Sequence, residues 1–291
     1  MLYLLVVNYQ SYPLVARLVE HFCILPSQSY QFIIINNFPP EKSDLENLQN
    51  DSVKIIEAGE NLGFSRACNL GLNWIYCQNS QGVVWLINPD IFFEPNMIAK
   101  AASFMQNHSQ ISILGTLIYA TDDKIWFGGG KFTFNALQAK ITSENLFFSY
   151  PQTSYIPCDW VSGCSMLINL SHFPECPQFD PNYFLYYEDC DFCQRYQRQN
   201  HLIAVTNQIS ITHQVSTVTN RDLRKKVYHI TYSYLLTLEK YANKMIFTFR
   251  LIRLLTHAMI LLPIQPKVAL GKLTGAWHYF KQRHLKCYLL Y

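Results

Sequence analysis

The stretch VKIIEAGENLGFSRACNLGLNWIYCQNSQGVVWLINPD, residues 53–90, contains two short apolar runs on either side of a longer amphipathic segment. The runs 53–58 and 83–87 predict buried strands, and the apolar spacing within 64–77 predicts a helix between them. A strand, a helix and a strand of these lengths are typical of a parallel sheet that helices cover on its faces.

The same alternation continues on both sides of this stretch. Apolar runs at 3–7, 32–35 and 111–117 predict further strands, and helical spacing follows Ser11 and recurs over 96–107. We therefore expect an α/β fold with a doubly wound, mostly parallel sheet. Ligands bind such sheets at the carboxyl ends of the strands, and the polar residues that the sequence places there are Asn8, Asn36, Asn61 and Asp90.

Beyond residue 119 the alternation fades. Loops or antiparallel strands are predicted for 128–130 and 147–157, a strand broken by Gly163 for 159–169, a loop that becomes a helix for 179–198, a strand for 204–213 and a helix for 221–241. The chain is thus expected to divide into a domain over 1–240, with halves 1–118 and 119–240, and a C-terminal helical appendage over 241–291.

The composition excludes several classes of protein. With 49% hydrophobic and 15% charged residues among 291, the chain has enough apolar material for a large core and is not a disordered protein. Its nine cysteines, scattered from Cys23 to Cys287, predict reduced thiols in a cytosolic protein. The first ten residues, MLYLLVVNYQ, lack a basic region and a cleavage site, and they predict a buried strand and no signal peptide.

Charge is distributed unevenly along the chain. Residues 240–291 carry nine Lys and Arg and no acidic residue, whereas residues 1–239 carry 14 basic and 20 acidic residues, a balance of −6. The uncharged stretch between Arg253 and Lys267 is 13 residues long. As a helix it would span about 20 Å, which is too short to cross the hydrocarbon core of a bilayer, about 30 Å thick. The segment 245–262 therefore predicts an interfacial helix on anionic lipid, with a packing helix or a homodimer interface as the alternative; no nucleic-acid-binding fold accompanies the charge.

Carboxylates gather in FDPNYFLYYEDCDFCQR, residues 179–195, among several Phe and Tyr residues. The aromatic neighbours of Glu188, Asp189 and Asp191 would remove water from these acids, raise their pKa values and suit them to general-base catalysis. A helix that begins near Glu188 would oppose this rise, because its positive end favours ionised acids. The alternative is an acidic helix start with an exposed face.

Two other segments contain candidate ligand groups. Asn88-Pro89-Asp90 ends a strand, where a carboxylate can bind a hard divalent cation together with phosphate oxygens, although simple turn chemistry is the alternative. ENLGFSRACNLG, residues 60–71, is a glycine-containing turn before a helix, where backbone N–H groups and Arg66 could meet an anion. Its spacing matches neither the dinucleotide fingerprint nor the P-loop. Taken alone, His213 and the pair Cys190 and Cys193 are typical of structural residues.

Seven segments in this order resemble the inverting nucleotide-sugar glycosyltransferases of family 2, in particular the bacterial rhamnosyltransferase branch that acts on surface polysaccharides. They are VVNYQS (6–11), IIINN (33–37), ENLGFSRACNLG (60–71), LINPDIFFEP (86–95), DWVSGCSMLI (159–168), FDPNYFLYYEDCDF (179–192) and ITHQVS (211–216). The resemblance implies a GT-A fold with a Rossmann-like nucleotide-sugar-binding half over 1–118 and an acceptor-binding, catalytic half over 119–240.

The resemblance also implies roles for single residues. Asp90, with Asn88 in place of the family's first Asp, would bind Mg²⁺ or Mn²⁺ together with His213. Asp189 would be the catalytic base, accompanied by Glu188 and Asp191. Asn36, where the family usually has Asp, would contact the nucleobase. The other residues assigned to the donor site are Asn8, Asn61, Gly63, Arg66, Asn69 and Gly163, the last as a small residue that lets the substrate approach the sheet.

The implied reaction is a single inverting displacement. A sugar would pass from a nucleoside diphosphate donor, with a dTDP-rhamnose-like donor favoured, to a saccharide acceptor that is lipid-linked, in the synthesis of surface polysaccharide or lipooligosaccharide. The protein would be cytoplasmic and peripheral on the inner face of the cytoplasmic membrane. The alternatives are a UDP-hexose donor and a non-catalytic sugar-nucleotide-binding scaffold of the same fold; a nucleotidylyltransferase is disfavoured because VVNYQSYP contains neither Gly nor Lys.

Overall fold

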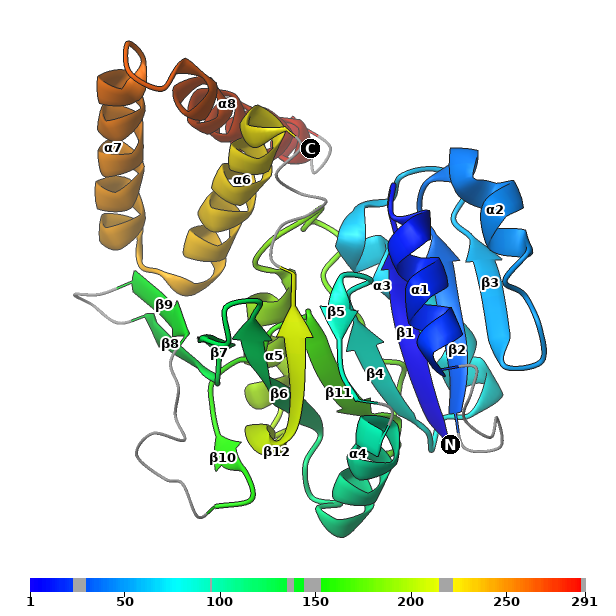
Figure 1. Ribbon diagram of the computed structural model, residues 1–291. Helices are drawn as coiled ribbons and strands as arrows, with labels where there is room; N and C mark the ends of the chain where they lie inside the picture. The colour runs from blue at the N-terminus through cyan, green and yellow to red at the C-terminus, as the bar shows by residue number, and fades with distance from the viewer. Residues whose placement is uncertain (23–29, 95, 135–138, 144–152, 215–221, 289–291) are drawn as a thin grey trace. The chain divides into compact units, whose positions relative to one another are not determined.

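Most of the strands form one large sheet in the computed structural model, which describes residues 1–22, 30–94, 96–134, 139–143, 153–214 and 222–288 (Figure 1). The strands of this sheet are β1 (Leu2–Asn8), β2 (Tyr30–Asn36), β3 (Val53–Glu57), β4 (Val83–Ile87), β5 (Ile91–Phe92), β6 (Ile113–Ala120), β7 (Ile125–Phe127), β10 (Ile156–Pro157), β11 (Ser165–Asn169) and β12 (Ile203–His213). Two further strands, β8 (Gly130–Phe134) and β9 (Ala139–Ser143), pair with each other.

The strand order is β10-β12-β6-β11-β4-β1-β2-β3, with β5 paired to β12 and β7 paired to β6. Neighbours β3, β2, β1 and β4 are parallel, and so are β6 and β12. Strand β11 lies antiparallel between β4 and β6, which leaves β4 and β6 pointing the same way. The sheet is therefore mostly parallel, and the expected α/β class with a doubly wound sheet is confirmed.

Helices cover both faces of this sheet. They are α1 (Tyr12–Phe22), η1 (Pro39–Glu41), α2 (Lys42–Glu46), α3 (Gly63–Gln78), α4 (Asn96–Asn107), η3 (Leu170–His172) and α5 (Glu188–Gln197). Helices α1 and α4 lie on one face of the sheet (Figure 1), and Arg17 of α1 and Met97 of α4 line the same hollow. Helices α3 and α5 share the other face, where Phe179 contacts both Phe64 and Phe192.

The core of the sheet explains why these strands form. All seven residues of β1 are buried, as expected for a strand that has neighbours on both sides and helices above and below. Three polar side chains inside this core are paired with one another, since Ser165 Oγ accepts hydrogen bonds from Trp85 Nε1 and Thr116 Oγ1, each at 2.9 Å. Helix α3 approaches β1 closely at Gly71, where an added Cβ would lie 2.3 Å from Leu5 Cδ1.

Most predicted elements agree with the structure. The strand 83–87 and the helix 96–107 have the predicted bounds, and the other elements of the first 120 residues differ from β1 to β6 by a few residues. The strand predicted for 159–169 is too long, because β11 begins only at Ser165. The Ser165 N–H donates to the Ser162 carbonyl and the Cys164 N–H donates to Ser162 Oγ, so residues 162–165 form a turn. Most of the segment 147–157, predicted as loops or antiparallel strands, lies outside the described residues.

The described residues group into two units. The first, here called the sheet unit, comprises Met1–Phe132, Thr142–Pro181 and Asp189–Val215, and the second, the helical unit, comprises Thr133–Ile141, Asn182–Glu188 and Ser216–Tyr291. By this grouping α6 (Leu223–Tyr241) belongs with α7 (Lys244–Leu261) and α8 (Pro266–Tyr288). The functional division at residue 240 stays a prediction.

The helical unit has its own small core. Asp222 and Asn243 cap α6 and α7, since their side chains accept hydrogen bonds from the N–H groups of Lys225 and Ile246. Helix α8 packs against α6 at a glycine, because a Cβ at Gly275 would lie 2.6 Å from the Tyr228 carbonyl oxygen. Within the described ranges, none of the helices has the length and apolar character needed to cross a bilayer.

Most of the nine cysteines lie in the part of the chain that the structure describes. Seven cysteines whose side chains the structure describes are free: Cys68, Cys77, Cys158, Cys164, Cys176, Cys190 and Cys193. Cys190 and Cys193 are buried, as expected for core residues.

Candidate active site

Polar side chains meet at the carboxyl ends of β1, β2 and β3. Asn36 lies beside Asn8 on one side and beside Glu57 on the other. The Asn36 amide nitrogen donates to both Glu57 carboxylate oxygens, at 3.0 and 3.2 Å, and Asn36 Oδ1 accepts from Asn8 Nδ2 at 3.3 Å. Asn8 Nδ2 also donates to Glu41 at 2.8 Å. The carboxamides of Asn8 and Asn36 are therefore held in fixed orientations by neighbouring groups.

The turn before α3 is fixed by two asparagines. Asn61 Oδ1 accepts from the Gly63 N–H at 3.0 Å and from Asn37 Nδ2 at 3.2 Å. Asn37 Oδ1 in turn accepts from the Leu62 N–H at 2.8 Å. Gly63 has φ of +76°, in the left-handed region that glycine adopts without strain. These contacts connect the end of β2 to the start of α3.

Two residues of α3 contact the segment that leads to α5. The Asn69 carboxamide accepts from the Phe179 N–H at 2.7 Å and donates to the Phe179 carbonyl at 2.8 Å. Arg66 is exposed and its Nε donates to the Pro181 carbonyl at 3.2 Å. The Asn69 contacts hold the segment before α5 against α3, which is a structural task. Arg66 uses only its Nε in the contact with Pro181, so other N–H groups of its exposed guanidinium face solvent and could bind a ligand.

A carboxylate and an imidazole meet where β4 and β12 end. Asp90 Oδ1 lies 3.2 Å from His213 Nε2, and both residues are buried. The pairing of β12 with β5 sets this contact, because His213 lies opposite Ile91. The Trp126 ring packs edge-on against the His213 ring, with 5.0 Å between the ring centres, and Trp126 is 40% exposed. Asn88 precedes this pair, and its N–H donates to the Cys164 carbonyl at 3.1 Å.

Asp189 is held by backbone groups. Its Oδ2 accepts from the Gly163 N–H at 3.0 Å, and its Oδ1 accepts from the Cys190 N–H at 2.8 Å. Burial raises the pKa of Asp189, while these two N–H groups partly oppose the rise. A carboxyl group with a raised pKa is a better proton acceptor than an ordinary aspartate.

Cys164 links the two acids in space. Burial raises the pKa of the Cys164 thiol well above its usual value, and the negative charges of Asp90 and Asp189 raise it further. Both carboxylates therefore lie within electrostatic reach of one buried thiol. Gly163 contacts Asp189 directly, with the position of its absent Cβ only 3.5 Å from Asp189 Cβ.

Asp191 differs from its neighbours in α5. It is fully buried and its Oδ2 accepts from Arg195 Nε at 2.7 Å, one helical turn later. Arg195 also donates to the Gln178 carbonyl at 2.7 Å. This ion pair fixes α5 to the segment before it, which is a supporting task. Glu188, the first residue of α5, is also buried.

Asp90 and His213 together fit a divalent cation. They offer one carboxylate oxygen and one imidazole nitrogen that are close together and buried. Within the described ranges there is no cluster of three or more His, Cys, Asp and Glu side chains that could hold a metal. The protein would thus supply two ligands, which is the usual case when phosphate oxygens of a substrate complete the coordination of Mg²⁺.

The sequence did not reveal several residues of this region. Asn37, Glu41, Glu57 and Trp126 were missed because each acquires its importance from a partner on another element. One signal was present, namely that Asn37 directly follows Asn36 at a strand end. The pairing of Asn36 with Glu57 is consistent with an amide at position 36, because a carboxylate there would be repelled by the negative charge of Glu57.

Comparisons with known proteins identify the family of this chain and its fold. The model of the family described as "Glycosyl transferase family 2" matches residues 3–166, which is more than half of the chain. The curated relatives include the low-salt glycan biosynthesis hexosyltransferase Agl10 of Haloferax volcanii, 24% identical over 202 residues. That match covers 68% of this chain and 62% of Agl10, so the chain spans less than two thirds of that relative's length.

A second curated relative is the N-acetylglucosaminyl-diphospho-decaprenol L-rhamnosyltransferase of Mycobacterium tuberculosis. It is 22% identical over 238 residues, which cover 74% of this chain and 76% of the relative. Among solved structures, GalNAc-T7 in complex with UDP, GalNAc and Mn²⁺ superposes with a TM-score of 0.56 at 16% identity. That superposition covers 86% of this chain and 53% of GalNAc-T7, and it shows a shared fold, the GT-A fold.

Proposed function

Because this chain belongs to glycosyl transferase family 2, we propose that it is a metal-dependent inverting glycosyltransferase that acts on a nucleoside diphosphate sugar. The donor that we favour is dTDP-rhamnose-like, and the acceptor is a lipid-linked saccharide. The main support within the structure is that both acids adjoin the turn that contains Gly163 and Cys164. Asp189 accepts from the Gly163 N–H, and the Cys164 carbonyl accepts from Asn88, two residues before the Asp90 that pairs with His213.

The proposed chemistry assigns one task to each group. Asp90 and His213 would hold Mg²⁺ or Mn²⁺, which, when bound, supplies positive charge to the departing diphosphate. Asp189, whose pKa burial raises, would accept the proton of the acceptor hydroxyl as its oxygen attacks the anomeric carbon. The bond to the diphosphate breaks in the same displacement, so the anomeric configuration inverts without a covalent enzyme intermediate. A retaining glycosidase, in contrast, forms such an intermediate.

The relatives support the choice of substrates. The M. tuberculosis relative is named for rhamnosyl transfer to a diphosphate-linked lipid, and Agl10 is named as a hexosyltransferase. Rhamnosyl transfer is therefore our first proposal and a UDP-hexose donor the second. The proposed products belong to surface polysaccharide or lipooligosaccharide synthesis.

A thermal-shift panel tests the donor. A ligand at about 100 times its Kd stabilises a protein by about 2.7 kcal/mol, and a weaker ligand at the same concentration stabilises it less. We therefore expect dTDP-rhamnose with Mn²⁺, the donor that we favour, to raise the melting temperature more than UDP-hexoses do. A larger shift with a UDP-hexose would select the alternative donor. The absence of any shift across the panel would contradict the proposal that the chain binds a sugar nucleotide.

We further propose that α7 docks on an anionic membrane at the cytoplasmic face. Five apolar residues form a stripe along α7, at the spacing of one helix face, and are 58–68% exposed: Met245, Phe249, Ile252, Met259 and Ile260. The stripe is flanked by Arg253 and His257, which are exposed, in a segment with nine basic and no acidic residues. An apolar stripe beside basic groups suits a membrane interface that contains anionic lipid.

Vesicle co-sedimentation tests this docking. We expect the double variant F249S/I252S to bind phosphatidylglycerol vesicles at least about tenfold more weakly than the wild type, since two large side chains lose their apolar burial. I125S serves as the matched control, because Ile125 is also an exposed apolar residue but lies in the sheet unit. Equal binding to neutral vesicles would contradict the role of charge. A dimer in solution that the same double variant dissociates would assign this face to a homodimer instead.

A further inference from the structure

The helical unit contains a cavity that the proposed reaction does not yet use. Its volume is about 410 Å³, within the range of small-molecule sites. It is lined by Asn182, Tyr232, Leu236, Glu239, Lys240, Tyr279, Gln282 and Arg283. Apart from Asn182, which lies on the segment before α5, these residues come from α6 and α8.

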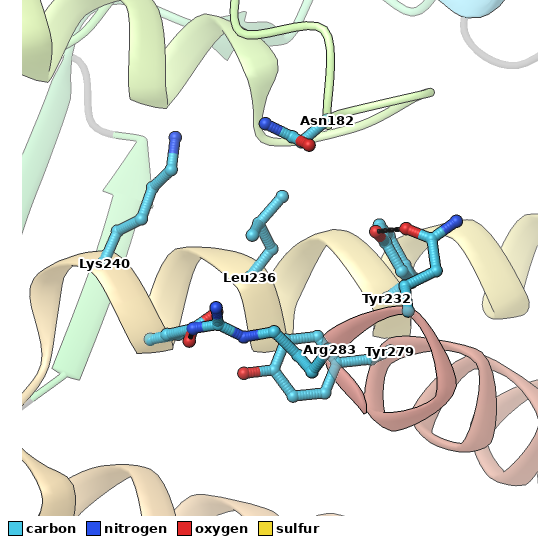
Figure 2. Close-up of a pocket in the computed structure, with 8 residues that line it drawn as sticks. Asn182, Tyr232, Leu236, Lys240, Tyr279 and Arg283 are labelled. Atoms are coloured by element: carbon cyan, nitrogen blue, oxygen red, sulfur yellow. Dashed lines mark hydrogen bonds and ion pairs between the residues drawn. The ribbon is translucent and has the colours of Figure 1, made fainter. Parts of the chain in front are cut away.

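The cavity combines apolar and polar walls. Figure 2 shows Leu236 between Asn182 and Arg283, with Lys240 toward one end and Tyr232 toward the other. Tyr279 adds an aromatic ring that is almost fully buried. An aliphatic side chain such as Leu236 can cover the C–H face of a sugar, and the surrounding amide and charged groups can bind hydroxyls and phosphate.

Several polar groups of the wall are held in place before any ligand binds. The Tyr232 hydroxyl donates to Gln282 Oε1 at 2.5 Å, a contact that Figure 2 marks. Arg283 forms an ion pair with Glu239. Lys240 Nζ lies 4.8 Å from the centre of the Tyr183 ring, which places the ammonium group over an aromatic face. Groups positioned in this way lose little entropy when a ligand binds.

The charge of the cavity favours an anion. Lys240 and Arg283 contribute two positive charges and Glu239 contributes one negative charge, a balance of +1. The segment 240–291 adds further basic residues and no acid. Arg and Lys are the side chains that bind phosphate oxygens most strongly, Arg through paired N–H groups and Lys as a point charge.

We propose that this cavity binds the phosphate-bearing sugar of the acceptor, with the sugar ring on Leu236 and the phosphate on Lys240 and Arg283. This inference rests on the proposed function, because it gives the lipid-linked acceptor a place to bind. Asn182 lies seven residues before Asp189, and a chain of that length spans at most about 25 Å. The chain itself therefore limits how far Asn182 can lie from the proposed base.

The test measures binding of glucose 1-phosphate by NMR titration in EDTA, which removes metal-dependent binding at Asp90. We expect K240Q/R283Q to raise the Kd at least about tenfold, because a charge-assisted contact to phosphate is lost at each position. The single variant K240Q should raise the Kd less than the double variant does. Because K240Q keeps the ion pair of Arg283 with Glu239, its melting temperature should equal that of the wild type, and an increase in its Kd then reports lost binding and not lost folding. K281Q is the matched control, since Lys281 is exposed on α8 outside the cavity.

Three outcomes would overturn the inference. These are an unchanged Kd in K240Q/R283Q, an equal loss in K281Q, and equal binding of methyl glucoside, which lacks the phosphate. The thermal-shift panel examines the donor separately, in the sheet unit. If the protein binds sugar nucleotides but does not bind glucose 1-phosphate at these residues, only this inference is wrong. If it binds no sugar nucleotide, the proposed function is wrong.

Discussion

Replacing Asp189 by Asn is expected to lower kcat about 10³-fold while leaving the Kd of the nucleotide sugar unchanged. General-base catalysis contributes about 10²–10⁴-fold in enzymes, and an amide cannot accept the proton of the acceptor hydroxyl. The donor contacts proposed at Asp90 and at the carboxyl ends of β1 and β2 are not altered by this change. Steady-state transfer assays and donor titrations on the same preparation would measure both quantities.

The control for this variant is D123N, which makes the same chemical change at an exposed position. The pH profile adds a second readout. Because burial raises the pKa of Asp189 above the usual value of about 3.9, the base is ionised only above that raised pKa, and kcat/KM should fall as the pH decreases through it. The residual activity of D189N should lack this acid limb. Turnover near that of the wild type in D189N would refute the assignment of the base.

The second large effect is expected at the proposed metal site. D90N should raise the Kd of the nucleotide sugar about 100-fold in Mn²⁺, because the carboxylate ligand is lost and even residues that only support metal ligands contribute about 10–100-fold to affinity. In EDTA the wild type and D90N should bind the donor equally weakly. H213Q should show the same dependence on metal, since His213 Nε2 faces the same carboxylate at 3.2 Å.

A matched control separates this effect from a general loss of negative charge. Glu94 is exposed and lies four residues after Asp90, so E94Q removes one charge nearby without touching the pair. We expect E94Q to bind the donor as the wild type does. An undiminished effect of Mn²⁺ on donor binding in D90N would show that the metal, if it binds, uses other groups.

The arrangement of strands and helices was readable from the sequence for a local reason. A buried parallel strand needs a continuous apolar run and a covering helix needs an apolar stripe, and both patterns lie within a few consecutive residues, as in β4 and α4. The strand predicted for 159–169 was too long because Ser162 turns the chain through its own hydrogen bonds. Apolar composition alone does not report such a turn.

The contacts within the candidate site depended on the tertiary structure. The sequence by itself determined which polar residues end the strands and which acids begin α5, because these positions follow from local pattern. Only the fold decided that His213 faces Asp90, that the Gly163 N–H holds Asp189 and that Asn36 meets Glu57. Each of these pairs joins segments that are distant in the chain, and their meeting depends on strand order and register, which no short stretch of residues encodes.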